Sequence, residues 1–477
     1  MMVMKILFVG SEATPFAKTG GLADVLGSLP QALAQRGHEV ALVIPKHRIV
    51  KENYQKSVVS LKQFRVKVHT KDEYVGIETM EHQGVKVYFI DNEYYFGYRE
   101  RLYGDFDDGE RYGYFNQAVV QMLHQLDYFP DILHLNDWQA GLIPYIIKTN
   151  HAKDLRYQNI KTLFTIHNIA YQGAFSKALL PYLNVPFKAE LEFENQINFL
   201  KTAIVTADRI TTVSPNYKDE LTHDYFGFGM SGLLRERYDK LEGILNGLDM
   251  DEFNPKTDER IATQFGVHNY LKGKKENKAA LLKVFHLEPL GLPIISMVSR
   301  LTEAKGFPLV EEIIETLLKE KKIQFVVLGS GDQNIEAFFN HLKQKYPKHV
   351  GLYFGYSDAL ARQIYAGSTF FLMPSRFEPC GLAQLISMRY GTLPIVRETG
   401  GLKDSVMPYN KYTHEGTGFS FTNYNAHEML DIIREALDLY DDQVNYKKLV
   451  KRVMQEDFSW EKSALKYELL YQKIKEA

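Results

Sequence analysis

Short apolar runs rich in β-branched and aromatic residues recur along this chain, with longer amphipathic stretches between them. Such runs are typical of strands buried on both faces of a parallel sheet, with helices covering it. Each half of the chain holds one series, and each series has the size of a domain. We expect strands at Lys5–Val9, Val40–Ile44, Val85–Ile90, Ile132–Leu135, Thr162–Ile166, Arg209–Val213, Ile294–Ser299, Gln324–Leu328, Leu352–Phe354, Thr369–Met373 and Leu393–Val396.

The sequence therefore predicts an α/β protein with two doubly wound, Rossmann-like domains that face each other across a cleft. A chain of 477 residues exceeds what one hydrophobic core supports, which independently favours two domains. Asn-Gly and Asn-Pro pairs interrupt the pattern near Asn246–Pro255. We expect the first domain to span residues 1–246 and the second 247–459.

Composition excludes several classes of protein. With 45% hydrophobic and 24% charged residues the chain is globular, and a net charge of -2 argues against a nucleic-acid binder. The one cysteine, Cys380, excludes an intrachain disulfide framework and fits a reducing cytosol. The apolar N-terminus is short and interrupted by Lys5, which is not typical of a signal peptide, and no apolar stretch approaches a membrane span. We expect a cytoplasmic protein that binds neither nucleic acid nor membrane.

Unusual residue clusters follow the carboxyl ends of the predicted strands, the edge where open α/β sheets bind ligands. If two sheets present such edges to each other, the site is the cleft between the domains. The clusters are Gly10–Gly21, Asn136-Asp137-Trp138, His167-Asn168, Arg300–Gly306, Gly329–Asp332, Gly355-Tyr356, Pro374–Pro379 and Thr399–Leu402.

One fragment nearly recurs: the first glycine loop, Thr19–Asp24, resembles the second glycine loop, Thr399–Asp404. Paired glycines ahead of a helix leave backbone N–H groups free to bind an anion. A single such loop is weak evidence, but one in each domain favours a grip on a diphosphate and its sugar from both sides. Three cations beside these loops, Lys18, Arg300 and Lys305, suit a phosphoryl leaving group; the alternative is that the two lysines are ordinary surface charges.

Other residues leave alternatives open. His167 is equally well explained as a functional group or as a hydrogen-bonded structural residue. Glu378, fixed by the following proline, is poorly explained as a solvated charge, whereas Cys380 is better explained as a packing residue than as a nucleophile.

Two Asp-x-Asp patterns, Asp105–Asp107 and Asp249–Asp251, lack supporting ligands, so we expect no metal site. Aromatic residues crowd the stretch Tyr94–Phe115, which we interpret as loop packing in preference to a glucan-binding surface.

Combined, these motifs resemble those of bacterial glycogen synthases and plant starch synthases. Lys18–Val25 is similar to the family's N-terminal donor loop, and Ser375–Leu382 followed by Thr399–Leu402 to its second-domain signature. The remaining matches, in family order over almost the whole chain, are His134–Trp138, Thr165–Gly173, Asn246–Asp249, Ser299–Leu301 and Lys305-Gly306.

The resemblance implies a GT-B architecture and metal-independent, retaining transfer of glucose from ADP-glucose to the nonreducing end of an α-1,4-glucan, with no cofactor. It implies catalytic roles for His167, Arg300, Lys305 and Glu378. It implies substrate contacts for Lys18, Gly20, Gly21, Asp24, Asp137, Asn168, Asn246, Tyr356, Cys380, Gly381, Leu382, Thr399, Gly400 and Gly401. As in GT-B relatives, the C-terminal helix 460–477 should pack back on the first domain through Trp460, Leu465, Tyr467, Leu469, Leu470 and Tyr471.

The chain departs from the family at Asn136 and Gln139, where many relatives carry histidine, and at Lys403, where a small residue is common. Two alternatives from other classes remain, a nucleotide-sugar 2-epimerase of the same architecture and a non-catalytic glucan-binding protein. The epimerase should lack the Lys18–Val25 loop, and the binding protein would not need Arg300, Lys305 and Glu378 together. The sequence does not determine the oligomeric state.

Overall fold

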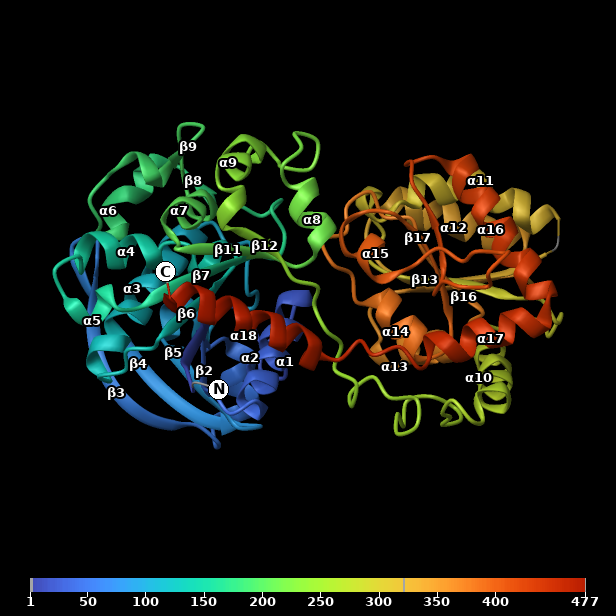
Figure 1. Cartoon of the computed structure of the whole chain (residues 1–477), viewed down its shortest axis with the longest axis horizontal. Coiled ribbons are helices and arrows are strands. Elements are labelled where there is room, and N and C mark those ends of the chain that lie inside the picture. The colour runs from blue at the N-terminus through green and yellow to red at the C-terminus, as the bar shows by residue number, and fades with distance from the viewer. Residues whose placement is uncertain (1–2, 321, 477) are drawn as a thin grey trace. The chain divides into compact units, whose positions relative to one another are not determined.

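A computed structural model describes residues 3–320 and 322–476 (Figure 1). Met1, Met2, Lys321 and Ala477, which belong to the predicted domain ranges, lie outside the described residues. The chain forms two compact units. Unit 1 comprises Met1–Gly247 together with Trp460–Ala477, and unit 2 comprises Leu248–Ser459.

Unit 1 is built on a nine-stranded sheet with the order β12-β11-β7-β6-β1-β2-β5-β4-β3. Every strand predicted for the first half forms, and these strands run parallel. The expectation of purely parallel strands is wrong at one edge, where β3 and β4 are antiparallel. The strands are β1 (Lys5–Val9), β2 (Glu39–Pro45), β3 (Val59–Val68), β4 (Lys71–His82), β5 (Val85–Asp91), β6 (Ile132–Asn136), β7 (Lys161–Ile166), β11 (Arg209–Thr212) and β12 (Leu241–Gly243).

Helices cover this sheet. Between β7 and β11 the chain forms a separate three-stranded sheet of β8 (Ala174–Phe175), β10 (Gln196–Asn198) and β9 (Glu192–Phe193). The helices of unit 1 are α1 (Gly21–Gln35), α2 (Arg48–Tyr54), α3 (Asp108–Gln125), α4 (Ile143–Asn150), α5 (Leu155–Gln158), α6 (Leu180–Leu183), α7 (Phe199–Thr206), α8 (Pro215–Glu220), α9 (Ser231–Glu236) and α18 (Trp460–Glu476).

Unit 2 is a six-stranded, wholly parallel sheet with the order β15-β14-β13-β16-β17-β18. Its strands are β13 (Ile294–Val298), β14 (Gln324–Gly329), β15 (Val350–Phe354), β16 (Phe370–Met373), β17 (Leu393–Arg397) and β18 (Phe419–Phe421). The helices are α10 (Tyr270–Val284), α11 (Phe307–Lys319), α12 (Gln333–Lys345), α13 (Asp358–Gly367), α14 (Ala383–Arg389), α15 (Gly400–Ser405), α16 (Ala426–Asp441) and α17 (Gln443–Val453). Only β18, three residues long, was not predicted in this sheet.

Helix α18 belongs to unit 1, where it packs beside α1 (Figure 1). Arg36 pairs with the buried Glu468 at 2.6 Å, and the Tyr471 hydroxyl bonds His134 Nδ1 at 2.7 Å. Two of the residues expected on its buried face, Leu465 and Leu469, are exposed. A helix repeats every 3.6 residues, so these two fall outside the stripe that meets the unit 1 core. The buried stripe is Trp460, Ala464, Tyr467, Leu470, Tyr471 and Ile474.

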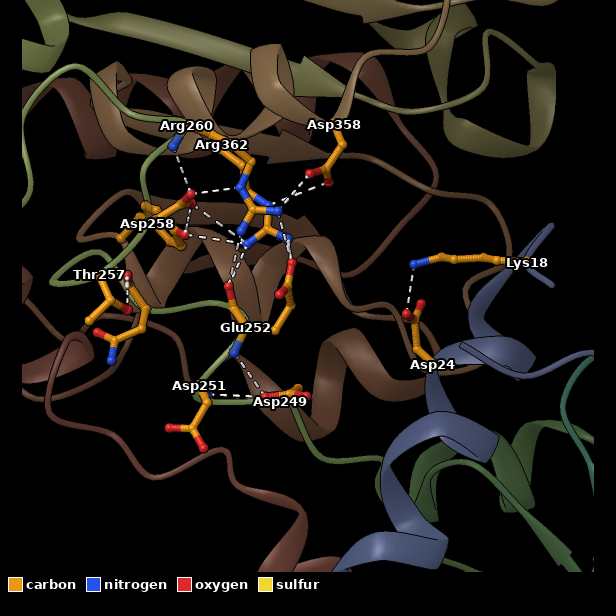
Figure 2. A network of polar contacts seen from close by, with 12 residues as sticks. Lys18, Asp24, Asp249, Asp251, Glu252, Thr257, Asp258, Arg260, Asp358 and Arg362 are labelled. Atoms are coloured by element: carbon orange, nitrogen blue, oxygen red, sulfur yellow. Dashed lines mark hydrogen bonds and ion pairs between the residues drawn. The ribbon is translucent and has the colours of Figure 1, made fainter. Parts of the chain in front are cut away.

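The segment that enters unit 2 is fixed by a partly buried ionic network (Figure 2). The Arg362 side chain, 3% exposed, pairs with Glu252 at 2.6 Å and with Asp358 at 3.4 Å. Arg260 pairs with Asp258 at 2.6 Å. These contacts hold the irregular segment before α10 against α13. Among the described residues, no helix has the length and apolarity that crossing a bilayer requires.

Candidate active site

At the carboxyl edge of the unit 1 sheet, the last residue of β6 and the residues that follow β6 and β7 form one hydrogen-bonded group. Asp137 accepts the His167 backbone N–H at 2.8 Å, and His167 Nε2 donates to Asn136 Oδ1 at 2.9 Å. The Asn136 amide is oriented by donating to the Val9 carbonyl at 3.2 Å. Asp137 has a φ of 54°, a strained value for a residue with a side chain. The structure thus brings Asp137 and His167 together, with Asn136 as the residue that orients the imidazole.

Burial determines the charges in this group. Desolvation lowers the pKa of His167 to about 3, so its imidazole is neutral at physiological pH. Desolvation also raises the pKa of Asp137 to about 7, although the backbone N–H groups of His167 and Asn168 oppose that rise. The edge therefore offers a neutral hydrogen-bonding ring and a carboxyl group that titrates near neutrality, rather than a fixed anion.

The first glycine loop is held by a buried carboxylate that sequence reasoning missed. Glu12, 3% exposed, accepts the Thr19 hydroxyl at 2.8 Å and also the Thr19 backbone N–H. Burial raises the pKa of Glu12. An acidic residue three positions beyond a buried strand was the available signal. Lys18 pairs with Asp24 at 2.6 Å (Figure 2), so the two charged residues predicted in this loop bind each other.

The glycines of this loop are not required by the packing of the protein itself. A Cβ atom on Gly21 would meet nothing within 4 Å, and one on Gly20 would only approach Glu12 at 3.9 Å. Gly20 caps α1 and Gly21 is its first residue, so the unpaired N–H groups of the first turn lie here. Space beside these N–H groups is the arrangement that close approach of an anion requires.

Asn246 and Asn168 differ in their surroundings. The Oδ1 atom of Asn246 is buried and has no hydrogen-bonding partner among the described residues. A buried acceptor without a donor is costly, so this oxygen is a candidate ligand contact. The Oδ1 atom of Asn168 instead accepts the Ala170 N–H at 3.0 Å within its own turn.

In unit 2 the structure joins two predicted residues that lie far apart in sequence. Lys305 Nζ contacts Glu378 Oε2 at 2.6 Å, and the Ser375 hydroxyl donates to the same oxygen at 2.9 Å. The side chains of Lys305 and Glu378 are 22% and 10% exposed. Gly306, which follows Lys305, has a φ of 80°, and a Cβ there would lie 2.0 Å from the Pro374 carbonyl oxygen. Only glycine permits this close approach of the two loops.

The second glycine loop differs from the first. A Cβ on Gly400 would lie 2.1 Å from the Glu378 carbonyl oxygen, and one on Gly401 would lie 2.4 Å from that of Cys380. The Gly401 N–H already donates to the Pro379 carbonyl at 3.0 Å. These glycines, with Thr399 as the N-cap of α15, hold that helix against the Glu378 loop.

The remaining predicted residues of unit 2 lie at the same edge of its sheet. Arg300 is exposed, and its side chain forms no ion pair with another described residue. Tyr356 is 83% exposed. Cys380 is buried, in agreement with a packing role, and Gly381 has a φ of 75° that suits glycine; Leu382 is half-buried beside it.

The two Asp-x-Asp patterns have partners within the protein. Asp105, Asp107 and Asp108 lie close enough together to hold a cation, yet Arg99 pairs with Asp107 at 2.6 Å and Arg111 with Asp108 at 2.7 Å. In the second pattern Asp249 accepts the backbone N–H groups of Asp251 and Glu252 (Figure 2). Both patterns therefore have structural roles.

Most of the aromatic stretch is buried. The packed residues are Tyr95, Phe96, Tyr112, Tyr114 and Phe115, while Tyr94, Tyr98 and Phe106 remain exposed. Loop packing therefore accounts for the larger part of this cluster.

Comparison with known proteins identifies the family. The starch synthase catalytic domain family matches residues 5–236, and the group 1 glycosyl transferases match residues 281–453. A glycogen synthase from Bacillus cereus (strain Q1) is 46% identical over 99% of this chain and 100% of its own length. The chain belongs to the glycogen synthase family. A second member, from Anoxybacillus flavithermus, is 45% identical over 99% of this chain and 98% of its own length.

Structural comparison agrees with membership of this family. The catalytic domain of starch synthase IV from Arabidopsis thaliana, solved with ADP and acarbose bound, matches with a TM-score of 0.92 and 33% identity over 100% of both chains. Sucrose-phosphate synthase from Thermosynechococcus elongatus matches with a TM-score of 0.60 at 18% identity, which shows the fold alone. The predicted GT-B fold is confirmed, and the chain is a glycosyltransferase.

Proposed function

We propose that this enzyme transfers glucose from ADP-glucose to the nonreducing end of an α-1,4-glucan, releases ADP, and retains the anomeric configuration. The similarity to curated glycogen synthases over the full chain is the observation that carries this proposal. The starch synthase that was solved with ADP supports ADP as the nucleotide product. We place the activity in the cytoplasm, where neither nucleic acid nor membrane takes part.

In unit 2 the proposed roles follow from charge and position. Arg300, exposed and without an ion-pair partner among the described residues, is suited to bind the donor diphosphate. Lys305 stabilises the negative charge that grows on the leaving group. Glu378 accepts hydrogen bonds from hydroxyl groups of the glucose. The exposed ring of Tyr356 is suited to lie beside the nucleoside.

In unit 1 the neutral imidazole of His167 and the carboxyl of Asp137 are proposed to contact the sugar, together with the unpartnered oxygen of Asn246. Lys18 and the N–H groups at Gly20 and Gly21 are proposed to bind phosphate oxygens. To bind the donor, Lys18 then has to leave Asp24 or contact Asp24 and the donor phosphate at the same time.

The chemistry needs charge stabilisation more than a nucleophile. The bond between the anomeric carbon and the phosphate oxygen breaks as an oxocarbenium-like centre forms, and the acceptor oxygen attacks on the same face. The proton of the attacking hydroxyl passes to the departing diphosphate. This route retains configuration and does not need a pair of carboxylates that act as nucleophile and acid.

Incubation with glycogen and either ADP-glucose or UDP-glucose, with released nucleotide measured, tests the proposal. We expect a clear preference for ADP-glucose. Equal or greater efficiency with UDP-glucose would overturn the donor assignment. If the nucleotide sugar is consumed but glycogen gains no glucose, the result would favour the nucleotide-sugar 2-epimerase instead.

A further inference from the structure

The carboxyl group of Glu12, which holds the first glycine loop, has no cation paired with it among the described residues. Its side chain is almost fully buried, and the charged group that acts on it most is the like charge of Asp24. The lysine that precedes the loop, Lys18, contacts Asp24 instead, at 2.6 Å (Figure 2). A buried anion without a compensating cation is costly, and here it lies at a loop that is proposed to bind a second anion.

The two oxygens of Glu12 have different surroundings. Oε2 accepts the Thr19 hydroxyl at 2.8 Å and also the Thr19 backbone N–H. Oε1 faces Gly20, because a Cβ atom on Gly20 would lie 3.9 Å from this oxygen and would approach nothing else outside its chain neighbours. Oε1 is therefore directed to the open space at Gly20 that we propose for a phosphate oxygen of the donor.

The protonation state of Glu12 decides whether that space accepts an anion. An ionised Oε1 can only accept hydrogen bonds, so it repels a phosphate oxygen. A protonated Oε1 donates to that oxygen, and a hydrogen bond to a charged acceptor is one of the strong kind. The neutral acid also keeps the loop fixed, because its carbonyl oxygen, Oε2, still accepts both bonds from Thr19. A proton on Oε1 thus turns Glu12 into a donor without loosening the loop.

The groups around Glu12 favour proton uptake when a further anion arrives. Burial raises the pKa of Glu12, the two bonds from Thr19 oppose that rise, and the carboxylate of Asp24 adds to it. A phosphate beside Oε1 brings more negative charge and raises the pKa again. The ionisable groups that act on Glu12, or on which Glu12 acts, include no cation: Asp24 on α1, Tyr103 before α3, Tyr112 on α3 and Asp137 after β6.

We propose that Glu12 is a donor-binding residue that contacts the diphosphate as a neutral carboxylic acid, so that binding of ADP-glucose takes up one proton from the solvent. The proposal rests on the proposed function, which puts phosphate oxygens at the N–H groups of Gly20 and Gly21. A carboxyl group kept neutral in order to donate a hydrogen bond is known enzyme chemistry. Where Glu12 is ionised in the free enzyme, the affinity for ADP-glucose should fall by up to about tenfold per pH unit.

The direct test is calorimetric titration of the full chain with ADP-glucose, without glycogen, in buffers of one pH and different enthalpies of ionisation. A terminal phosphate has a second pKa of about 6. The doubly esterified diphosphate of ADP-glucose has no such proton, so any proton taken up near neutrality is bound by the protein. We expect uptake of about one proton per ADP-glucose in the wild type at pH 7 and close to none in Glu12→Gln.

Glu12→Gln also separates this role from a purely structural one. Its amide oxygen can accept both bonds from Thr19, and its NH₂ group can donate to the phosphate as the acid does. The ratio of the wild-type Kd to the Glu12→Gln Kd should therefore rise by about tenfold per pH unit between pH 7 and 9. If Glu12 only braces Thr19, the variant should bind no more tightly than the wild type at any pH. Glu52→Gln, at an exposed carboxylate of the same unit, should match the wild type.

Thr19→Val gives a second test that keeps Glu12 itself. It removes one bond that favours the ionised form, so Glu12 should stay protonated to a higher pH and the onset of proton uptake should move upward. Equal proton uptake in the wild type and Glu12→Gln, or uptake that disappears in Asp137→Asn instead, would overturn the proposal.

The binding measurements need no transfer of glucose. Proton uptake that depends on Glu12 in an enzyme that adds no glucose to glycogen would support the role of Glu12 and refute the proposed function. Transfer of glucose by an enzyme that binds ADP-glucose without proton uptake would do the reverse, so the two failures are distinguishable.

Discussion

The Lys305–Glu378 pair offers the sharpest test of the proposed chemistry. Lys305→Ala leaves Glu378, whose side chain is 10% exposed, with Ser375 as its remaining donor in the described contacts. Losing one partner costs about 3–5 kcal/mol in a buried ion pair and under about 1 kcal/mol in an exposed one. The partial burial of this pair places the loss of unfolding free energy at about 2 kcal/mol. For a unit of this size we expect the melting temperature to fall by about 4–8 °C.

The effect on catalysis should be larger than the effect on stability. Loss of one electrostatic contact to the leaving group typically lowers turnover by about 10²–10³. Glu378→Gln keeps the side-chain size and the Ser375 bond but removes the charge, so turnover should again fall while ADP binding stays nearly unchanged. Lys345→Ala is a matched control, because Lys345 pairs with Glu315 on the surface of the same unit. That control should change neither stability nor turnover appreciably.

The double variant separates two roles for Glu378. If Glu378 also stabilises charge on the sugar, the double variant should turn over more slowly than Lys305→Ala alone. If Glu378 only positions Lys305, the double variant should turn over no more slowly than Lys305→Ala. The measurements are turnover, ADP affinity and melting temperature for all three variants and the control. A stable Lys305→Ala enzyme with near wild-type turnover would refute the reasoning.

Three further predictions follow from the site. Gly400→Ala should destabilise unit 2 by more than about 3 kcal/mol, because its Cβ would lie 2.1 Å from the Glu378 carbonyl oxygen. Gly21→Ala, in contrast, should leave the melting temperature unchanged and lower turnover. A Gly400→Ala enzyme that is inactive but stable would contradict this prediction. Because burial raises the pKa of Asp137 to about 7, the folded state holds more protons than the unfolded state between about pH 4 and 7, and its stability falls as pH rises through that window. The melting temperature of Asp137→Asn should therefore rise relative to that of the wild type as the pH is raised from 5 to 8. A difference between the two melting temperatures that does not change with pH would argue against the raised pKa. EDTA should not reduce activity, and a loss restored by magnesium or manganese would show that an Asp-x-Asp pattern binds metal.

The strands and the edges that carry the site were predictable because buried parallel strands are continuous apolar runs. The β3–β4 hairpin was not, since most of β3 is exposed and its polar residues give no such run. Pairing across loops was also beyond the sequence: Lys305 and Glu378 were each singled out, but their contact depends on how β13 and β16 are placed side by side. Glu12 was missed because its role, to hold Thr19, depends on a turn that only the folded loop reveals.

The exposed positions of Leu465 and Leu469 show a second limit of prediction from the sequence pattern. Composition and period identified the last helix as amphipathic, but the neighbouring surface determines which side of a broad apolar stripe is covered. Ala464 and Ile474 complete the buried face instead. A pattern thus predicts that a helix needs a partner more reliably than it predicts every residue of the contact.

The return of α18 to unit 1 has a consequence for synthesis on the ribosome. Unit 2 is one continuous segment, whereas the core of unit 1 stays open beside α1 until Trp460–Glu476 has been made. About 210 residues separate the two parts of unit 1. Because the ribosome adds about 5–20 residues per second, the second part follows the first after roughly 10–40 s. During that interval a hydrophobic surface on the first-made part of the protein is uncovered. Nascent unit 1 is therefore the part of this chain that we expect molecular chaperones to bind, although it leaves the ribosome first.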